Sequence, residues 1–184
     1  MSKLVILDRD GVINLIGPNK EDRITNPSEW EAVPNSLEAI VKLKQAGFTV
    51  CIATNQSMIS KGIVSINMLE AIHSKMQLLL KSMGAIIDDI FVCPHQDLDN
   101  CNCRKPKPGL LLEASKKYNI NTKKQLIPFV GDSDIDLLAA IEGGFLPVLV
   151  KTGKGLQTLE KIKALNIKNL LVFEDLSAFV TSWI

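Results

Sequence analysis

The sequence predicts an α/β protein with a doubly wound, mainly parallel sheet, formed as a single domain over residues 1–184. Short apolar runs rich in β-forming residues alternate with longer segments in which apolar residues recur every three to four positions. The runs are continuously apolar, as is typical of strands covered by helices on both faces. Polar clusters follow directly after three of these runs, at the edge where parallel sheets bind their ligands.

The first predicted strand, residues 4–7, ends at two carboxylates, Asp8 and Asp10, which are followed by Gly11. Residues two apart in extended backbone point to the same side, so both carboxylates are expected to converge on one point. Two facing carboxylates are costly unless a cation or a proton lies between them. The pair therefore favours a cation site, and the alternative is a solvated turn, because Asp and Gly are common in turns.

The segment 15–34 carries three prolines and no clear period, which predicts a long loop or small flap above the end of the first strand. Asn35 and Glu38 form a capping-box pattern, so a helix is expected to begin there and to close at Gly47. The apolar run at 48–53 predicts the second strand.

The rest of the chain continues this alternation of strands and helices. Apolar residues recur at helical spacing most strongly in 65–83, where Gly84 supplies the stop. Pro108 suits a first helical turn, and Asp175 can cap the last helix. The remaining predicted strands are 86–92, 126–130, 145–150 and 170–173, and the remaining predicted helices are 65–83, 108–118, 135–143, 156–165 and 175–183.

The composition restricts the classes of function. Apolar content of 46% and charged content of 22% are ordinary for a globular protein, and a net charge of +1 gives no basic field for nucleic acid. No apolar run is long enough to span a bilayer, and Asp8 interrupts the apolar stretch that a signal peptide would need. We therefore expect a cytoplasmic protein without a nucleic-acid or membrane partner, with a monomer as the default.

Three strand ends and one loop carry the residues that phosphoryl transfer requires. Carboxylates hold Mg²⁺, while a hydroxyl and a lysine neutralise the phosphoryl oxygens. Each cluster alone could be a turn or a helix cap, but their joint position at strand ends favours a site. The clusters are Asp8/Asp10, Thr54-Asn55, Arg104-Lys105 and Asp132/Asp134/Asp136.

A second constellation consists of Cys93, His95, Cys101 and Cys103. Three thiols and an imidazole suit tetrahedral Zn²⁺ and leave no open position, so we expect a structural ion that fixes the following loop. The alternative is four incidental buried residues, although they gather three of the four cysteines within eleven positions. Cys51 is expected to be an inert core residue, and His73 a surface or boundary residue of its helix.

Four stretches resemble the motifs of the haloacid dehalogenase superfamily: Asp8-Arg9-Asp10-Gly11-Val12, Thr54-Asn55, Lys105, and Gly131-Asp132-x-x-x-Asp136. The resemblance covers residues 4 to about 150, and the short insertions are similar to members without a large cap domain. It implies the Rossmann-like fold of that superfamily. By this resemblance Asp8 would attack phosphorus and become an aspartyl-phosphate, and Asp10 would be the general acid and base.

The resemblance also implies a role for the remaining motif residues. Thr54 and Lys105 would stabilise the transferring phosphoryl group. Mg²⁺ would be held by the Asp8 carboxylate, the Asp10 backbone carbonyl and Asp132. Asp136 would orient water or Lys105 rather than bind the metal directly.

The pattern C-P-H-x5-C-N-C-R-K-P-K-P-G resembles the branch that contains heptose bisphosphate phosphatases and histidinol-phosphate phosphatases. The stretch from Thr54 to Gly62 is more similar to the heptose enzymes, which remove the C7 phosphate of D-glycero-D-manno-heptose 1,7-bisphosphate. Histidinol phosphate and a broader range of sugar phosphates are the alternatives. The residues implied to contact this small phosphorylated sugar are Asn55, Gln56, Ser57 and Arg104, with Arg104 on the phosphate that is not cleaved.

Two positions depart from the heptose pattern. Met58 stands where those enzymes usually carry glycine, and Ser133 stands where some of them carry a substrate-contacting lysine.

Two other classes of protein compete with an enzyme. A phospho-acceptor signalling module would need an acceptor aspartate after its third strand, where this chain has Cys93, Pro94 and His95. A zinc-stapled binding protein would need a loss of catalysis, although every catalytic residue type is present. A Walker phosphate loop is absent, because Gly153-Lys154-Gly155 is too short.

Overall fold

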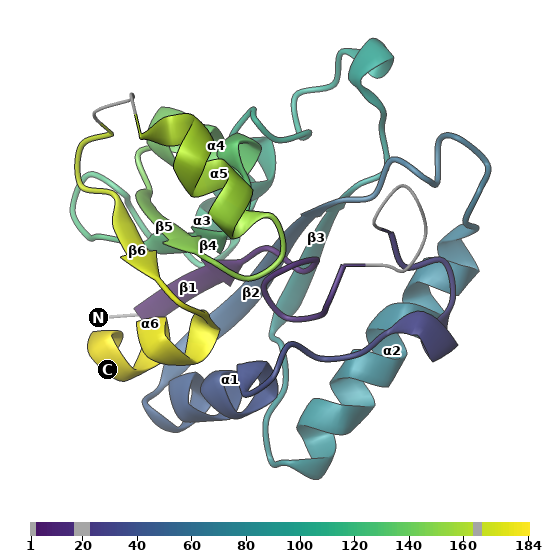
Figure 1. Ribbon diagram of the computed structural model, residues 1–184, viewed down its shortest axis with the longest axis horizontal. Helices are drawn as coiled ribbons and strands as arrows, with labels where there is room; N and C mark the ends of the chain where they lie inside the picture. The colour runs from purple at the N-terminus through teal and green to yellow at the C-terminus, as the bar shows by residue number, and fades with distance from the viewer. Residues whose placement is uncertain (1–2, 17–22, 164–166) are drawn as a thin grey trace.

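Six parallel strands form one sheet in the computed structural model, which describes residues 3–16, 23–163 and 167–184. The spatial order of the strands is β3-β2-β1-β4-β5-β6 (Figure 1). Their bounds are β1 (Lys3–Leu7), β2 (Phe48–Asn55), β3 (Asp89–Cys93), β4 (Pro128–Gly131), β5 (Leu146–Val150) and β6 (Leu171–Phe173). The predicted fold class, with helices covering a parallel sheet, is confirmed.

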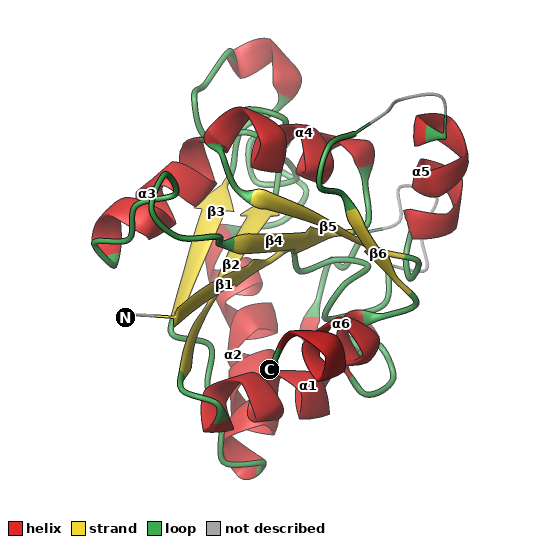
Figure 2. Cartoon of the chain, turned by 90° about the vertical axis from the view of Figure 1, so that its left-hand side faces the viewer, coloured by secondary structure: helices red, strands yellow, loops and turns green. Residues whose placement is uncertain are grey.

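Helices cover both faces of the sheet, with α1, α2 and α6 on one side and α3, α4 and α5 on the other (Figure 2). Their bounds are α1 (Ser36–Gln45), α2 (Ile66–Ser82), α3 (Gly109–Lys117), α4 (Asp134–Gly143), α5 (Gly155–Ile162) and α6 (Leu176–Trp183). Two short 3₁₀ turns, η1 (Pro27–Glu29) and η2 (Asp97–Asp99), lie in the loops. Among the described residues, no helix combines the length and the apolar character needed to cross a bilayer.

The central strand β1 is covered by helices on both faces, which explains why its sequence is continuously apolar. Val5 and Leu7 pack in the core cluster that includes α1, α2 and α6 residues, whereas Leu4 and Ile6 pack in the cluster with α3 and α4. All four side chains are at most 1% exposed. A polar residue at any of these positions would lose hydration without gaining a partner.

The order of the strands brings distant segments of the chain together. The chain runs outward from β1 to β2 and β3, then returns to place β4 on the other side of β1. The backbone N–H of Asp8 donates to the carbonyl of Val130 over 2.8 Å, so the pairing of β1 with β4 continues one residue beyond β1. Open parallel sheets bind ligands where the strand order reverses in this way.

The third strand begins at Asp89, three residues later than the sequence predicts. The Gln77 side chain of α2 explains the shift, because its amide bonds both the N–H and the carbonyl of Ile87 at 3.0 and 2.9 Å. These backbone groups are thus satisfied by a helix side chain instead of the sheet. The fourth strand likewise starts at Pro128 rather than at residue 126.

The predicted capping box at Asn35 is wrong. Asn35 has φ of +62° and makes no capping bond with its side chain, because a capping residue needs extended backbone and asparagine tolerates the left-handed region. Asp175 does cap α6, accepting from the N–H of Ala178 over 2.7 Å. The predicted flap at 15–34 includes residues 17–22, and the predicted helix at 156–165 includes 164 and 165, which lie outside the described residues.

Candidate active site

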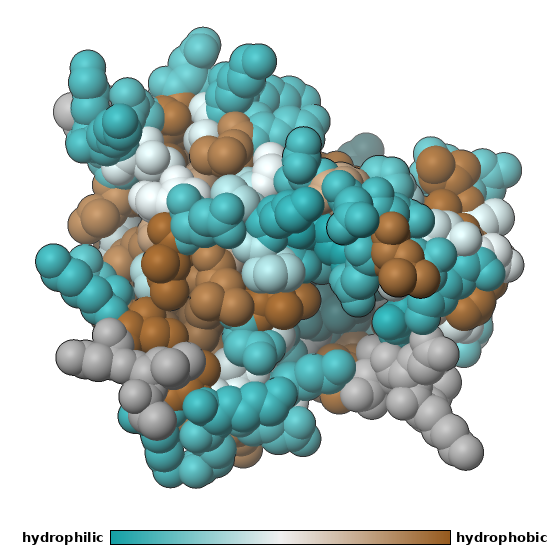
Figure 3. All heavy atoms as spheres, turned by 90° about the horizontal axis from the view of Figure 1, so that it is seen from above, coloured by the Kyte–Doolittle hydropathy of each residue, from teal (hydrophilic) through white to brown (hydrophobic). Residues whose placement is uncertain are grey.

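A cleft of about 190 Å³ opens at the carboxyl ends of β1, β2 and β4. Seen from above, hydrophilic side chains gather around a hollow in the surface, whereas many apolar side chains lie to one side of it (Figure 3). The predicted catalytic and substrate-binding residues all line the cleft. Its lining comprises Asp8, Asp10, Ile16, Arg23, Thr54, Asn55, Gln56, Ser57, Met58, Arg104, Lys105, Asp132, Ser133, Ile135 and Lys154.

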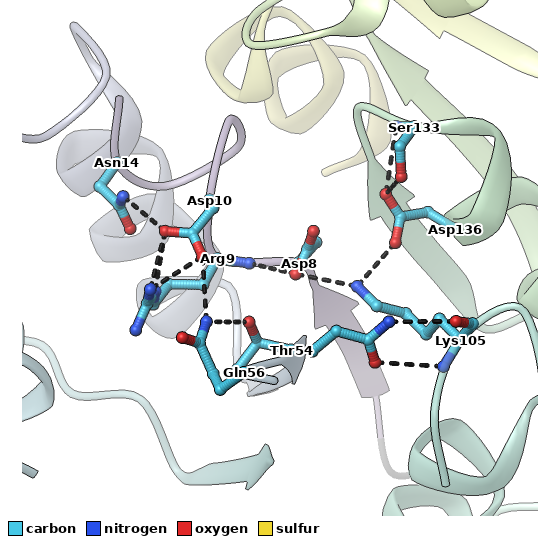
Figure 4. A network of polar contacts seen from close by, with 10 residues as sticks. Asp8, Arg9, Asp10, Asn14, Thr54, Gln56, Lys105, Ser133 and Asp136 are labelled. Carbon is cyan, nitrogen blue, oxygen red and sulfur yellow. Dashed lines mark hydrogen bonds and ion pairs between the residues drawn. The ribbon is translucent and has the colours of Figure 1, made fainter. Parts of the chain in front are cut away.

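A buried lysine lies at the centre of the site (Figure 4). The ammonium of Lys105 is 2.9 Å from Asp8 Oδ1 and 2.6 Å from Asp136 Oδ1, and its side chain is 1% exposed. Burial alone would lower the pKa of Lys105, but the two carboxylates outweigh it and raise that pKa. Lys105 is therefore a permanent cation that faces Asp8.

Two neighbours fix this lysine and its partner. The Asn55 side chain binds the backbone of Lys105 at both ends, accepting from its N–H at 3.1 Å and donating to its carbonyl at 3.0 Å. Asp136 accepts bonds from the N–H and the hydroxyl of Ser133, the capping residue directly before α4. Asn55 thus joins the end of β2 to the loop that carries Lys105, and a substrate contact for Asn55 stays a prediction.

Asp10 forms an ion pair with a second buried cation, the Arg9 guanidinium. Arg9 donates from Nε and Nη2 to both Asp10 oxygens at 2.8–3.1 Å, and the Asn14 and Gln56 amides donate at 2.9 and 3.0 Å. Burial would raise the pKa of Asp10, but the Arg9 charge and these hydrogen bonds hold it below its ordinary value. Gln56 also donates to the Thr54 hydroxyl at 2.9 Å, which links Thr54 to Asp10.

The remaining carboxylates are crowded. One oxygen from each of Asp8, Asp132 and Asp136 lies within 4.8 Å of the others, and Lys105 is the cation between them. Burial, followed by repulsion from neighbouring carboxylates, raises the pKa of Asp132 to about 8; burial also raises that of Asp8 to about 7, against the opposing charge of Lys105. If all three carboxylates are ionised, the cluster carries two excess negative charges. This donor set fits a divalent cation with a preference for oxygen.

Two glycines make room for the Asp132 carboxylate. A Cβ on Gly11 or on Gly153 would lie 2.1 Å from Asp132 Oδ2, and both residues have positive φ, at +84° and +57°. The backbone N–H of Lys154 donates to the same oxygen over 2.8 Å. The orientation of Asp132 therefore depends on two close backbone approaches.

The four predicted zinc ligands form a cluster beside the cleft. Cys93 Sγ is 3.7 Å from both Cys101 Sγ and His95 Nδ1, while Cys103 Sγ is 3.5 Å from Cys101 Sγ and 3.3 Å from His95 Nδ1. These separations exceed a disulfide bond and approach the edge of about 3.8 Å of a tetrahedron with 2.3 Å Zn–S bonds. Burial raises the pKa of the Cys93 and Cys103 thiols, whereas hydrogen bonds lower the pKa of Cys101 to about 6 against the effect of burial. The set fits Zn²⁺.

The rim of the cleft contains the predicted Arg104 and two further cations that the motifs did not indicate. Arg104 donates to Asp97 Oδ1 at 2.5 Å and to the His95 carbonyl at 3.2 Å. Arg23, which the sequence analysis missed, donates to the Ser57 hydroxyl over 3.0 Å. Lys154 also lines the cleft. Arg23 and Lys154 lie in segments without a motif, so their position at the cleft could be learned only from the fold.

Comparison with known proteins places the chain in a family. Residues 3–138 match the family model described as Polynucleotide kinase 3 phosphatase, and residues 102–179 match one described as HAD-hydrolase-like. D-glycero-beta-D-manno-heptose-1,7-bisphosphate 7-phosphatase of Pseudomonas aeruginosa is 45% identical over 179 residues, covering 97% of this chain and 96% of that protein. The chain belongs to the haloacid dehalogenase superfamily. Within it, these matches confirm the predicted heptose bisphosphate phosphatase branch.

Solved structures of this branch share the fold. The crystal structure of D,D-heptose 1.7-bisphosphate phosphatase from B. bronchiseptica, complexed with magnesium and phosphate, is 42% identical with a TM-score of 0.91, covering 98% of this chain and 97% of that chain. The enzyme from Burkholderia thailandensis is 37% identical with a TM-score of 0.74, covering 99% and 98%. A member of the branch thus binds magnesium and phosphate in this fold.

Replacement of Gly153 by alanine tests the packing around Asp132. The new Cβ would overlap Asp132 Oδ2, so we expect the magnesium concentration for half-maximal activity to rise at least about tenfold. Gly62→Ala is the matched control, because Gly62 has a similar φ of +68° but nothing within 4 Å. Both variants should lose about 1–2 kcal/mol of unfolding free energy from backbone strain. An equal magnesium requirement in the two variants would contradict this role for Gly153.

Proposed function

We propose that this protein is a Mg²⁺-dependent phosphatase that removes the C7 phosphate of D-glycero-D-manno-heptose 1,7-bisphosphate through an aspartyl-phosphate intermediate. The observation that carries the proposal is the buried Asp8 carboxylate, 2.9 Å from the Lys105 ammonium and within 4.8 Å of Asp132, at the end of β1. The identity of 45% to a heptose-1,7-bisphosphate 7-phosphatase supports the choice of substrate.

In the first step, a carboxylate oxygen of Asp8 attacks phosphorus, and the bond between phosphorus and the C7 oxygen breaks. Asp10, which must enter this step in its protonated form, donates that proton to the leaving oxygen, so the sugar departs as an alcohol and Asp10 becomes a carboxylate. Lys105 and the Thr54 hydroxyl neutralise charge on the non-bridging phosphoryl oxygens. The hydrogen bond between Thr54 and Gln56 supports this orientation of the hydroxyl.

In the second step, Asp10 accepts a proton from a water molecule, which attacks phosphorus on the side opposite Asp8. The acyl-phosphate bond breaks, inorganic phosphate leaves, and the Asp8 carboxylate is restored. Arg9 and its hydrogen bonds hold the pKa of Asp10 low despite burial, so Asp10 is ionised and able to accept this proton as the base of the second step. Burial raises the pKa of Asp8, and the positive charges of Lys105 and of a bound divalent ion would favour the ionised form that a nucleophile requires.

Asp8, the backbone carbonyl of Asp10 and Asp132 would hold the magnesium ion. When bound, the ion supplies positive charge that brings Asp8 and the phosphoryl oxygens together. Asp136 is committed elsewhere, because it pairs with Lys105 at 2.6 Å and with Ser133. This supports its proposed role in orienting Lys105.

The second phosphate of the substrate would bind at the rim. Arg104 is proposed to hold it with its planar guanidinium, while Asn55, Gln56 and Ser57 contact the sugar. Asp97, whose side chain is 87% exposed, forms an ion pair with Arg104. The substrate phosphate would have to displace the Asp97 carboxylate from Arg104. The contact of Arg23 with Ser57 places another cation on the same wall of the cleft.

Zinc is proposed as a structural ion held by the Cys93, His95, Cys101 and Cys103 set. Cys101 and Cys103 directly precede Arg104 and Lys105, so the ion would fix the loop that presents both cations. The cytoplasm is proposed as the compartment, because thiols in a reducing compartment remain available as metal ligands.

Phosphate release in the presence of Mg²⁺ tests the proposed function. We expect the heptose bisphosphate to be hydrolysed with a far higher kcat/KM than histidinol phosphate, and Asp8→Asn to lower kcat at least about a thousandfold because an amide is a poor nucleophile. Lys105 keeps Asp136 as its partner, so the variant should retain the circular dichroism spectrum of the unmodified protein. Near-normal turnover by Asp8→Asn would place the chemistry on another residue, and a preference for histidinol phosphate would overturn the substrate.

Asp97→Asn tests the rim pair. The substitution leaves Arg104 without its competing carboxylate, so we expect KM for the bisphosphate to fall by about two- to fivefold, in the range of an exposed ion pair. The heptose 7-phosphate, which lacks the second phosphate, serves as the control substrate and should keep its KM. An equal change for both sugars would show that Arg104 does not bind the second phosphate.

Cys101→Ala tests the zinc proposal. We expect elemental analysis to find about one zinc per chain before the substitution and none after it, with a melting temperature lower by roughly 10 °C. Cys51→Ala is the control, because Cys51 is fully buried in β2 and outside the ligand set. Unchanged zinc content and melting in Cys101→Ala would refute the site.

A further inference from the structure

The Arg9 guanidinium is a buried cation whose role the proposed reaction leaves open. Its side chain is 0% exposed. In the sequence, Arg9 stands between Asp8 and Asp10, directly after β1. A buried charge must be paired and hydrogen-bonded to be tolerated. Arg9 uses Nε and Nη2 for this purpose, which bind both oxygens of Asp10.

The third nitrogen of the guanidinium points to a residue of helix α2. Arg9 Nη1 lies 3.1 Å from His73 Nε2, and the two residues are far apart in the sequence. A guanidinium has only donors, so His73 Nε2 must be the acceptor and Nδ1 must carry the proton. Burial, together with the Arg9 charge, lowers the pKa of His73 to about 3, so the ring is neutral as this bond requires.

The guanidinium is thus held at both ends. Since it is planar and rigid, fixing Nη1 on His73 also fixes the direction in which Nε and Nη2 point. That direction sets the plane of the Asp10 carboxylate, which receives two parallel bonds from Arg9 (Figure 4). The Asn14 and Gln56 amides complete the arrangement from other sides.

We propose that His73 is a positioning residue, which orients the Asp10 carboxylate through the Arg9 guanidinium for proton transfer to the leaving oxygen. The inference rests on the proposed function, in which Asp10 is the general acid. His73 does not line the cleft and touches no reacting atom. Its removal would leave Arg9 Nη1 unpaired and free the guanidinium to turn.

A comparison of two substrates with different leaving groups distinguishes the orientation of Asp10 from a general loss of protein stability. A sugar alcohol is a poor leaving group and must be protonated as it departs, whereas p-nitrophenolate leaves without a proton. We expect His73→Leu to lower the single-turnover rate of sugar release from the heptose bisphosphate by about tenfold or more, a large part of what a general acid contributes. For p-nitrophenyl phosphate, the single-turnover rate of p-nitrophenolate release should change by less than about twofold. The comparison uses single-turnover release of each leaving group, because the second step, in which Asp10 activates water, is common to both substrates.

Two further variants complete the experiment. His73→Gln can present an amide oxygen near the place of Nε2, so it should recover most of the lost rate of sugar release. Glu70→Leu, at an exposed position of α2, is the control and should leave both substrates unaffected. Equal losses in the single-turnover release rates of the two leaving groups, or no loss with the sugar, would overturn the proposal.

A measurement without turnover keeps this inference separate from the proposed function. In ¹⁵N NMR spectra, the hydrogens of Arg9 Nη1, the nitrogen that contacts His73, should be protected from exchange in the unmodified protein and in His73→Gln, and should exchange rapidly in His73→Leu. Protection that persists in His73→Leu would overturn the positioning role. If the protein hydrolysed neither substrate, the proposed function would fail, while the NMR result would still decide whether His73 fixes Arg9.

Discussion

The pairing of one buried ammonium with two buried carboxylates is the constraint on which the rest of the site depends. Lys105 lies within 3 Å of both Asp8 and Asp136, and all three side chains are largely shielded from water. Such a cluster is tolerated only if every charge keeps its partner at close range, because an unpaired buried charge costs several kcal/mol. The three residues come from three separate parts of the chain, so the fold must place their charged groups within hydrogen-bonding distance of one another.

The sheet supplies that accuracy. Asp8 follows β1, and Asp136 lies in the first turn of α4 after β4, which pairs with β1. Lys105 belongs to a loop, and loops are usually less well fixed than strands. Here the Asn55 amide binds both backbone groups of Lys105, and the Cys/His cluster lies immediately before it. The loop therefore gains contacts that resemble those of a regular element.

Much of this arrangement follows from short stretches of sequence. The alternation of apolar runs and periodic segments is a local signal, and so are the carboxylates that follow Leu7 and Gly131. The Cys/His spacing is equally local, because ligand sets of this kind depend on close neighbours in the chain. These features predicted the fold class and identified most of the residues that line the cleft.

The contacts that escaped prediction are long-range. Nothing near Arg9 in the sequence indicates that its guanidinium reaches His73, and the late start of β3 depends on a Gln77 side chain from another element. Asn35 shows the opposite failure: its spacing to Glu38 fits a local rule, but the backbone takes a conformation that the rule excludes. Arg23 and Lys154 reach the cleft only through the packing of their loops.

The Cys/His cluster lies on both sides of the segment 96–100, with Cys93 and His95 before it and Cys101 after it. If the proposed zinc ion joins these residues, changes in the length or composition of the segment need not move the lysine that follows. Asp97, which faces Arg104, belongs to this segment. A lineage could therefore remodel the mouth of the cleft by insertion or replacement there, acquiring new specificity while the chemistry beneath stays untouched.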